Sequence, residues 1–143
     1  MEDRYRQTLD YLYTRLPMFS HMGKDAIKKD LGNTRQLCAV LGTPHEKFKS
    51  IHIAGTNGKG SVSHMLSAAL QHAGYKTGLY TSPHLADFRE RIRINGKPVS
   101  TSWVCDFVDH HREDIEQIAP SFFEITVAMA FAAFAEEQVD VAI

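Results

Sequence analysis

The residues best suited to chemistry in this sequence lie in one glycine-rich run, Ala54-Gly55-Thr56-Asn57-Gly58-Lys59-Gly60-Ser61. Glycines let the backbone turn tightly so that successive N–H groups point inward, and a following helix adds the positive end of its dipole. Lys59 supplies a mobile cation of the kind that binds the outer phosphates of a nucleotide. The run therefore predicts a phosphate-binding loop, and a plain glycine-rich turn is the alternative.

The run departs from the strict Walker pattern G-x-x-x-x-G-K-[ST]. Ile53 stands where the first glycine is required, and Gly60 separates Lys59 from Ser61. The prediction consequently depends on the elements on either side of the run. Residues 51–54 fit a short strand, and residues 61–72 fit a helix with an apolar face. The members of that face are Val62, Met65, Leu66, Ala69 and Leu70.

Further periodic segments place this β-loop-α unit in an α/β domain. Residues 76–80 fit a second strand, and the intervening helix is the connection that parallel pairing requires. Residues 91–99 alternate around Asn95-Gly96, a strong hairpin signal, and residues 139–143 fit a last strand. Helices are expected over 3–16, 33–41 with Asn33 as cap, 101–118 and 121–138, with a surface loop over 18–31. We therefore expect an α/β, P-loop NTPase-like domain: a mostly parallel sheet flanked by helices, with a small β-hairpin excursion.

The composition narrows the class of protein. The chain has 143 residues, of which 43% are hydrophobic and 23% charged, which fits a soluble domain and argues against disorder. The longest apolar stretch, residues 125–135, is well short of the roughly 20 residues of a membrane helix. The charged start lacks the form of a secretory signal, so a cytoplasmic location is expected. A net charge of −1 gives no general attraction to nucleic acid, and Cys38 and Cys105 are too few for a disulfide framework.

Five motifs, in this order, resemble the folylpolyglutamate synthase/dihydrofolate synthase branch of the Mur-ligase superfamily. They are Asp30-Leu31-Gly32, Gly55-Thr56-Asn57-Gly58-Lys59-Gly60-Ser61, Tyr80-Thr81-Ser82-Pro83-His84-Leu85, Glu90-Arg91-Ile92 with Ile94-Asn95-Gly96, and Phe122-Phe123-Glu124. The resemblance extends over residues 18–143. Gly60 and Ser82 favour the folate branch, because Mur ligases that act on cell-wall precursors usually have Thr after the loop Lys and lack the TSPHL signature.

The resemblance implies an ATP-dependent ligase that joins L-glutamate to the carboxylate of a folate or of dihydropteroate through an acyl phosphate, giving ADP and phosphate. It implies ATP and Mg²⁺ as cofactors, Lys59 as the catalytic cation, and Ser82 and Glu124 as metal ligands. The nucleotide-binding residues would be Gly55, Thr56, Asn57, Gly58, Lys59, Gly60 and Ser61. The substrate-binding residues would be Asp30, Leu31, Gly32, His84 and Arg91. The alternatives are a Mur ligase acting on a cell-wall nucleotide precursor and a non-catalytic nucleotide-binding module.

The candidates outside the glycine-rich run also have structural interpretations. Ser121-Phe122-Phe123-Glu124 is itself a capping box, and the same carboxylate oxygens of Glu124 cannot serve both the cap and a metal at full strength. The other structural interpretations are a strand-ending turn for Ser82, an exposed loop histidine for His84, a plain turn for Gly32, and a solvated strand face for Arg89, Arg91 and Arg93.

Residues 1–143 are expected to form the N-terminal ATP-binding domain of such an enzyme, the counterpart of the central domain of Mur ligases. The sequence stops inside its last expected strand. We therefore expect a truncated sheet, a C-terminal glutamate-binding domain that is absent from the chain, and no ligase activity from residues 1–143 alone. The resemblance implies small-molecule substrates, no nucleic-acid or membrane partner, and a monomer.

Overall fold

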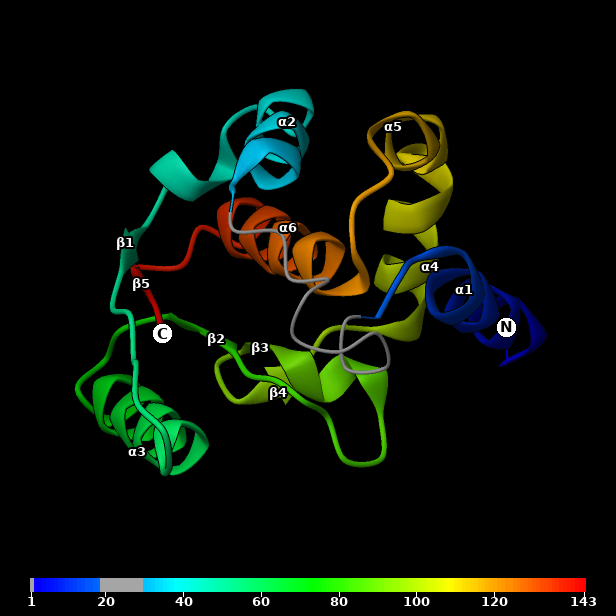
Figure 1. Cartoon of the computed structure of the whole chain (residues 1–143). Helices are drawn as coiled ribbons and strands as arrows, with labels where there is room; N and C mark the ends of the chain where they lie inside the picture. Colours follow the sequence, from blue (N-terminus) through cyan, green and yellow to red (C-terminus); the bar gives the residue numbers. More distant parts are fainter. Residues whose placement is uncertain (1, 19–29) are drawn as a thin grey trace. The chain divides into compact units, whose positions relative to one another are not determined.

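The computed structural model describes residues 2–18 and 30–143 (Figure 1). They form two compact units, and each is described by itself. The first unit comprises Met1–Gly42 and Thr101–Met129, and the second comprises Thr43–Ser100 and Ala130–Ile143. Most of the surface loop expected over residues 18–31 lies outside the described residues. Within the described part of the chain, every helix is too short or too polar to cross a membrane.

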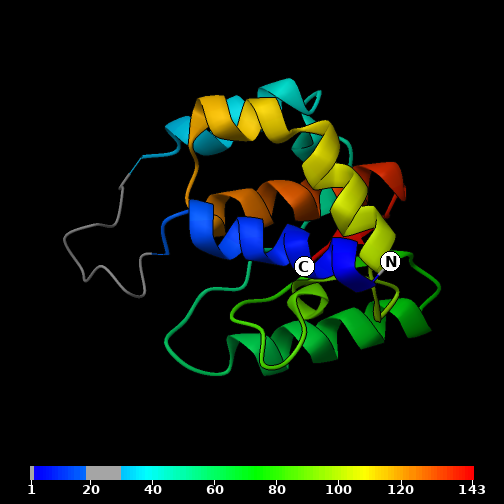
Figure 2. The same cartoon turned by 90° about the vertical axis from the view of Figure 1, so that its right-hand side faces the viewer.

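The first unit is built from helices. They are α1 (Glu2–Arg15), α2 (Gly32–Val40), α4 (Thr101–His110), α5 (Arg112–Ile118) and the N-terminal half of α6 (Phe122–Glu136). Helix α1 packs against α4, and α2 packs against α5 (Figure 2). Their inward faces form an apolar core whose fully buried members include Leu12, Leu37, Val104, Val108, Ile115, Ile125 and Met129.

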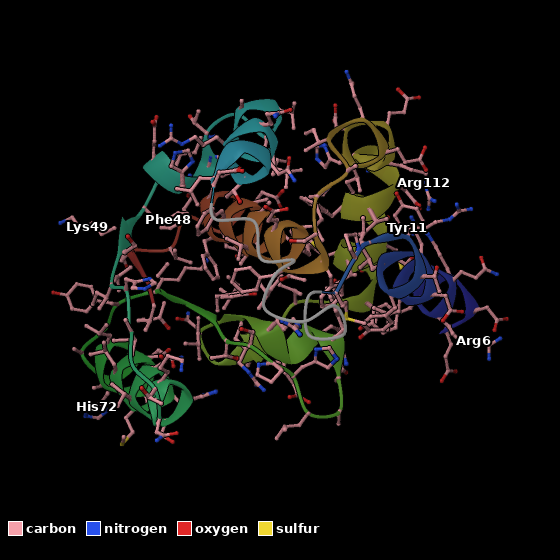
Figure 3. All side chains as sticks on the ribbon, in the orientation of Figure 1. Arg6, Tyr11, Phe48, Lys49, His72 and Arg112 are labelled. Carbon is pink, nitrogen blue, oxygen red and sulfur yellow. The ribbon has the colours of Figure 1, made fainter. Side chains whose placement is uncertain are left out.

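Two surface contacts tie α1 to the helices that follow it in the first unit. The Arg4 guanidinium lies 2.8 Å from the Asp106 carboxylate and 2.6 Å from that of Asp109. The Arg112 guanidinium lies 4.3 Å from the centre of the Tyr11 ring, and Figure 3 labels both residues. Because the partners of Arg4 are about half exposed, water screens these ion pairs and their contribution to stability is modest.

Two helix expectations in the first unit are wrong. The single helix expected over 101–118 breaks at His111, which separates α4 from α5. The break changes the direction of the chain, so that α4 packs on α1 and α5 on α2. Asn33 does not cap α2, because the helix begins one residue earlier, at Gly32, with Leu31 in the cap position and no side-chain cap bond.

The second unit contains a five-stranded sheet in the order β1-β5-β2-β3-β4. The strands are β1 (Lys49–Ser50), β2 (Thr77–Tyr80), β3 (Ile92–Ile94), β4 (Lys97–Pro98) and β5 (Val141–Ala142). Strand β5 pairs in parallel with both β1 and β2, with Val141 opposite Lys49 on one side and Thr77 on the other. Strand β3 pairs antiparallel with β2 and with β4.

The sheet is therefore mixed, and the expected mostly parallel sheet is wrong. Only a loop and the short 3-10 turn η4 (Phe88–Arg91) connect β2 to β3, too little chain for a parallel crossover, so β3 returns antiparallel. The hairpin expected around Asn95-Gly96 is confirmed as β3 and β4, with φ of 47° and 74° at these two residues. The strand expected over 51–54 begins earlier, as β1, although the Ile51 N–H still donates to the Ala142 carbonyl at 2.8 Å.

Helix α3 (Lys59–His72) packs against β2 with a different face from the expected one. Its buried residues are Ser63 and Ser67, whereas Val62 and Met65 are exposed. Small hydroxyl residues allow a close approach to the sheet, and the buried Ser67 and Thr77 hydroxyls lie 3.2 Å apart. On the C-terminal half of α6, the Phe134 ring meets the Phe48 ring edge-on, with 5.6 Å between ring centres.

Gly78→Ala should destabilise the second unit. A Cβ at Gly78 would lie 2.5, 2.7 and 2.8 Å from three atoms of the Phe134 ring. That ring is only 1% exposed and has no room to move away. Overpacking of this kind costs about 1–3 kcal/mol, so the midpoint of urea unfolding should fall. Gly60→Ala is the matched control, because no heavy atom lies within 4 Å of its added methyl group. An unchanged midpoint for Gly78→Ala would contradict the contact.

Candidate active site

The glycine-rich run follows β1 and leads into α3 in the second unit, as the sequence predicts, but α3 begins at Lys59, so residues 59–61 of the run form its first turn. Gly58 occupies the N-cap position of α3 with a φ of 77°, a left-handed conformation that favours glycine. The first N–H groups of α3, from Lys59 onward, have no intrahelical acceptors and carry the positive end of the helix dipole. Residues 54–62 are exposed throughout, so these donors are open to a ligand.

The Lys59 side chain folds back over this loop. Its Nζ donates to the Gly55 carbonyl at 2.6 Å and, more weakly, to the Thr56 carbonyl at 3.4 Å. The ammonium group is therefore held beside the helix N-terminus by neutral acceptors alone. A phosphate oxygen would be a stronger, charged acceptor for the same donor.

A second loop leaves the same edge of the sheet. Because β1 and β2 both run parallel to β5, the chain segments after their carboxyl ends emerge on one side. The segment after β2 carries Ser82, which is exposed, and His84, which is partly buried. Open α/β sheets bind ligands outside the carboxyl ends of their parallel strands. The structure thus brings the glycine-rich run and the Ser82 loop to one edge of the second unit.

The carboxylate of Glu90 fixes the tip of this second loop. It accepts hydrogen bonds from the backbone N–H groups of Leu85, Ala86 and Asp87 at 2.9, 3.0 and 2.8 Å. Three donors on one carboxylate stabilise its charged form and hold the pKa of Glu90 at about 2. Asp87 in turn caps η4 by accepting from the Arg89 N–H at 2.8 Å.

His84 and Arg91 form a pair in the same loop. Arg91 Nε donates to His84 Nδ1 at 2.7 Å. Partial burial, together with the Arg91 charge, lowers the pKa of His84 below its usual value, and Glu90 and Asp87 oppose this shift. Arg91 is only 7% exposed, so the expectation that it belongs to a solvated strand face is wrong. Its guanidinium lies within the loop and contacts His84.

Glu124 lies in the first unit, at the start of α6, and it forms the capping box that its sequence predicts. Its Oε2 accepts from the Ser121 N–H at 2.7 Å, and its own N–H donates to Ser121 Oγ at 3.2 Å. Glu124 Oε2 also accepts from the Asn33 side-chain amide at 3.1 Å. Both bonds to the carboxylate use Oε2 and neither uses Oε1, so the two carboxylate oxygens have different surroundings.

The Asp30-Leu31-Gly32 segment lies at the start of α2 in the first unit, with Gly32 as the first residue of the helix. Asp30 Oδ1 accepts from the Gly32 N–H at 2.9 Å, which makes a local turn, and all three residues are exposed. Asn33 follows directly and contacts Glu124, so the structure brings this segment and Glu124 together. The sequence predicted Asn33 only as a helix cap and included Glu90 only in a motif, without a site role for either. Asn33 bonds a residue 91 positions away in the sequence, and Glu90 bonds the backbone of a loop, and neither contact leaves a local sequence signal.

Comparisons with known proteins agree on one family. No family model matches the chain. The Bacillus subtilis protein named dihydrofolate synthase/folylpolyglutamate synthase is 38% identical over 138 residues, which is 92% of this chain and 30% of that protein. The chain thus spans less than a third of the length of the curated relatives that it matches.

Solved structures give the same result. A Mycobacterium tuberculosis folylpolyglutamate synthase complexed with ADP aligns with a TM-score of 0.86 and 37% identity, covering 98% of this chain and 31% of that one. A folylpolyglutamate synthase complex with AMPPCP and folate aligns with a TM-score of 0.84 and 32% identity, covering 96% of this chain and 34% of that one. The α/β fold with a mixed sheet flanked by helices is therefore shared with these enzymes.

Glu90→Gln should lower the thermal unfolding midpoint, and the difference from the wild type should shrink in acid. The folded pKa of about 2 is lower than the unfolded value of about 4.5. The stabilisation is consequently complete above the unfolded pKa and is lost as pH falls through the folded one. The measurement is the difference in Tm between the two proteins from pH about 7 to about 2. A difference that stays constant over this range would show that the carboxylate is not held by these three donors.

Proposed function

We propose that this chain, which belongs to the folylpolyglutamate synthase/dihydrofolate synthase family and matches its N-terminal part, binds ATP for the ligation of L-glutamate to a folate or dihydropteroate carboxylate. The observation that carries the proposal is the glycine-rich run at the N-terminus of α3, with the Lys59 ammonium held over it. The Mur-ligase alternative is not favoured, because the matching proteins carry the names of folate enzymes.

The reaction has two steps. A carboxylate oxygen of the folate attacks the γ-phosphorus of ATP, the bond to the bridging oxygen breaks, and ADP leaves with that electron pair. The glutamate amine then attacks the acyl carbon, the carbon–oxygen bond to phosphate breaks, and the amine loses a proton as the amide forms. Charge accumulates on the transferred phosphoryl group, so electrostatic stabilisation and positioning must dominate catalysis.

The second unit supplies the nucleotide side of this chemistry in the proposal. The N–H groups at the start of α3, together with Gly55, Thr56, Asn57, Gly58, Gly60 and Ser61, bind the phosphates, as in a P-loop. Lys59 exchanges its bonds to the Gly55 and Thr56 carbonyls for bonds to phosphate oxygens. These acceptors are neutral, so the exchange replaces bonds in which only the donor is charged by bonds in which donor and acceptor carry opposite charges.

Ser82 and Glu124 are each proposed as ligands of Mg²⁺. Both offer hard oxygen donors, and Mg²⁺ needs few protein ligands because it keeps several waters and binds substrate phosphates. Among the described residues, no group of three or more acidic, histidine or cysteine side chains forms a denser metal site. The cap of α6 uses Oε2 of Glu124, so Oε1 is the oxygen that could bind metal while the cap stays intact. Bound Mg²⁺ would neutralise charge on the phosphoryl oxygens.

The substrate side of the proposal draws on both units separately. The exposed residues at the start of α2 in the first unit are available to a pterin ring: Asp30, Leu31 and Gly32. In the second unit, His84 is proposed to orient a substrate or phosphate oxygen. Arg91, being buried and bonded to His84, acts through that ring in this proposal.

The proposal also includes the domain role, the oligomeric state and the location expected from the sequence. Residues 1–143 form an N-terminal ATP-binding part, which works as a monomer in the cytoplasm on small-molecule substrates. Because these relatives are about three times as long, we expect residues 1–143 by themselves to bind ATP without joining glutamate to a folate. Every measurement of ligase activity proposed below therefore uses a chain of the relatives' full length. The amine attack requires positioning, and positioning can account for several kcal/mol of a barrier.

Lys59→Met should weaken ATP binding and abolish glutamate-dependent ADP release in the presence of a folate. The substitution removes the cation and leaves the exposed loop backbone in place, so the Tm should be nearly unchanged. Calorimetric titration with ATP measures the affinity. Lys97→Met is the matched control, because Lys97 is an exposed lysine of the same unit, on β4. Wild-type affinity and turnover in Lys59→Met would refute the phosphate-binding assignment.

Glu124→Gln and Ser82→Ala should each raise the Mg²⁺ concentration needed for activity. Ser121→Ala separates the metal role from the cap, because it removes the hydroxyl that accepts from the Glu124 N–H but keeps the carboxylate. We expect Ser121→Ala to cost about 1 kcal/mol of stability with no change in Mg²⁺ dependence. Activity against Mg²⁺ concentration and a thermal melt are measured for each variant. If Glu124→Gln changes only the melt, the carboxylate serves the cap alone.

A further inference from the structure

The loop that carries Ser82 and His84 has no regular secondary structure to hold it. It follows β2 directly and continues to η4, and Ser82, Leu85 and Ala86 are all exposed. The Leu85 side chain is 94% exposed, so apolar packing does not fix the tip. Polar contacts from within the second unit must therefore set the position of the loop.

Glu90 supplies the contacts that reach consecutive backbone N–H groups at the tip. Its two carboxylate oxygens take three consecutive backbone donors: Oε2 accepts from Leu85, and Oε1 accepts from Ala86 and Asp87. One side chain thus holds the backbone that begins immediately after His84. A carboxylate suits this position because it only accepts hydrogen bonds and has about four lone-pair sites.

Glu90 is itself held in place from both sides. Its own N–H donates to the Asp87 carbonyl at 3.0 Å, which closes η4. Its carbonyl accepts from the Thr81 hydroxyl at 3.3 Å, and the Thr81 N–H donates to the Arg91 carbonyl at 3.1 Å. Thr81 is the residue before Ser82. The contacts around Glu90 therefore close the loop at its start and at its tip, with Ser82 and His84 between them.

We propose that Glu90 is the positioning residue that sets Ser82 and His84 for the reaction, by holding the backbone of residues 85–87. The inference rests on the proposed function of Ser82 and His84, and Glu90 itself contacts neither ATP nor substrate in it. Loss of the carboxylate frees the backbone of the tip, and the loop then samples positions in which Ser82 and His84 are misplaced. Residues that orient the ligands of a metal typically affect metal affinity or activity on the order of 10- to 100-fold.

The test compares Glu90→Gln, Glu90→Asp and the wild type. Gln keeps one acceptor oxygen and places an NH₂ donor against backbone donors, whereas Asp keeps the carboxylate but is shorter by one methylene. Glu46→Gln is the matched control, because Glu46 is an exposed glutamate on another 3-10 turn of the same unit, η3 (Pro44–Glu46). Circular dichroism below the melting temperature confirms that each variant is folded.

The first readout is hydrogen–deuterium exchange at the amides of residues 85–87. We expect slow exchange in the wild type and in Glu46→Gln, and exchange faster on the order of tenfold or more in Glu90→Gln, with Glu90→Asp in between. Fast exchange of these amides in the wild type would overturn the proposal even if no variant folds.

The second readout is the Mg²⁺ dependence of ATP binding and of glutamate-dependent ADP release. We expect Glu90→Gln to need on the order of tenfold more Mg²⁺ and to lose kcat, with Glu90→Asp partly restoring both. Freed amides with unchanged Mg²⁺ dependence and unchanged kcat would overturn the positioning role. Failure of the proposed function gives a different result, because Lys59→Met would then bind ATP like the wild type while the exchange behaviour of residues 85–87 stayed as described.

Discussion

The parallel pairing of β5 with both β1 and β2 is the constraint on which the candidate site of the second unit depends. Strand β5 has only two residues, yet backbone bonds of residues 140–143 reach both of its neighbours. The Ile51 N–H donates to the Ala142 carbonyl at 2.8 Å, and the Tyr80 N–H donates to the Ile143 carbonyl at 2.9 Å. On the β2 side, the Asp140 and Ile143 N–H groups donate to the Lys76 and Gly78 carbonyls at 2.8 and 3.0 Å. Without these bonds, nothing in the sheet order would join β1 to β2.

This pairing explains why residues far apart in the sequence share one edge. The glycine-rich run follows β1 and the Ser82 loop follows β2, so the register set by β5 also sets the separation of the two loops. A salt bridge also supports the pairing of β5 with β2. Lys76, just before β2, has its Nζ 2.8 Å from the carboxylate of Glu137, which precedes β5. The two loops carry the side chains proposed for the reaction, while the pairing of residues 140–143 sets where those loops begin.

The sequence predicted the elements that depend on local chemistry. The hairpin followed from Asn95-Gly96, the capping box from Ser121 and Glu124, and the position of the glycine-rich run from its own glycines. The predictions from the sequence failed where contacts between distant parts of the chain determine which residues are buried. Helix α3 buries Ser63 and Ser67, whose small side chains allow a close approach to β2. It does not bury the apolar stripe that includes Val62 and Met65. The burial of Arg91 likewise depends on His84, seven residues earlier, which no alternation along a strand reveals.

Glu90 and Glu124 show how one type of side chain can serve both structure and a reaction. Glu90 accepts three backbone N–H groups and Glu124 accepts one, and each is near a residue or atom proposed for the reaction. Glu90 uses both oxygens on backbone donors, which leaves it suited to holding a loop. Glu124 directs both of its structural bonds to Oε2. The division between the two oxygens removes the conflict between cap and metal that the sequence alone poses, because fixing Oε2 also fixes the direction in which Oε1 can bind.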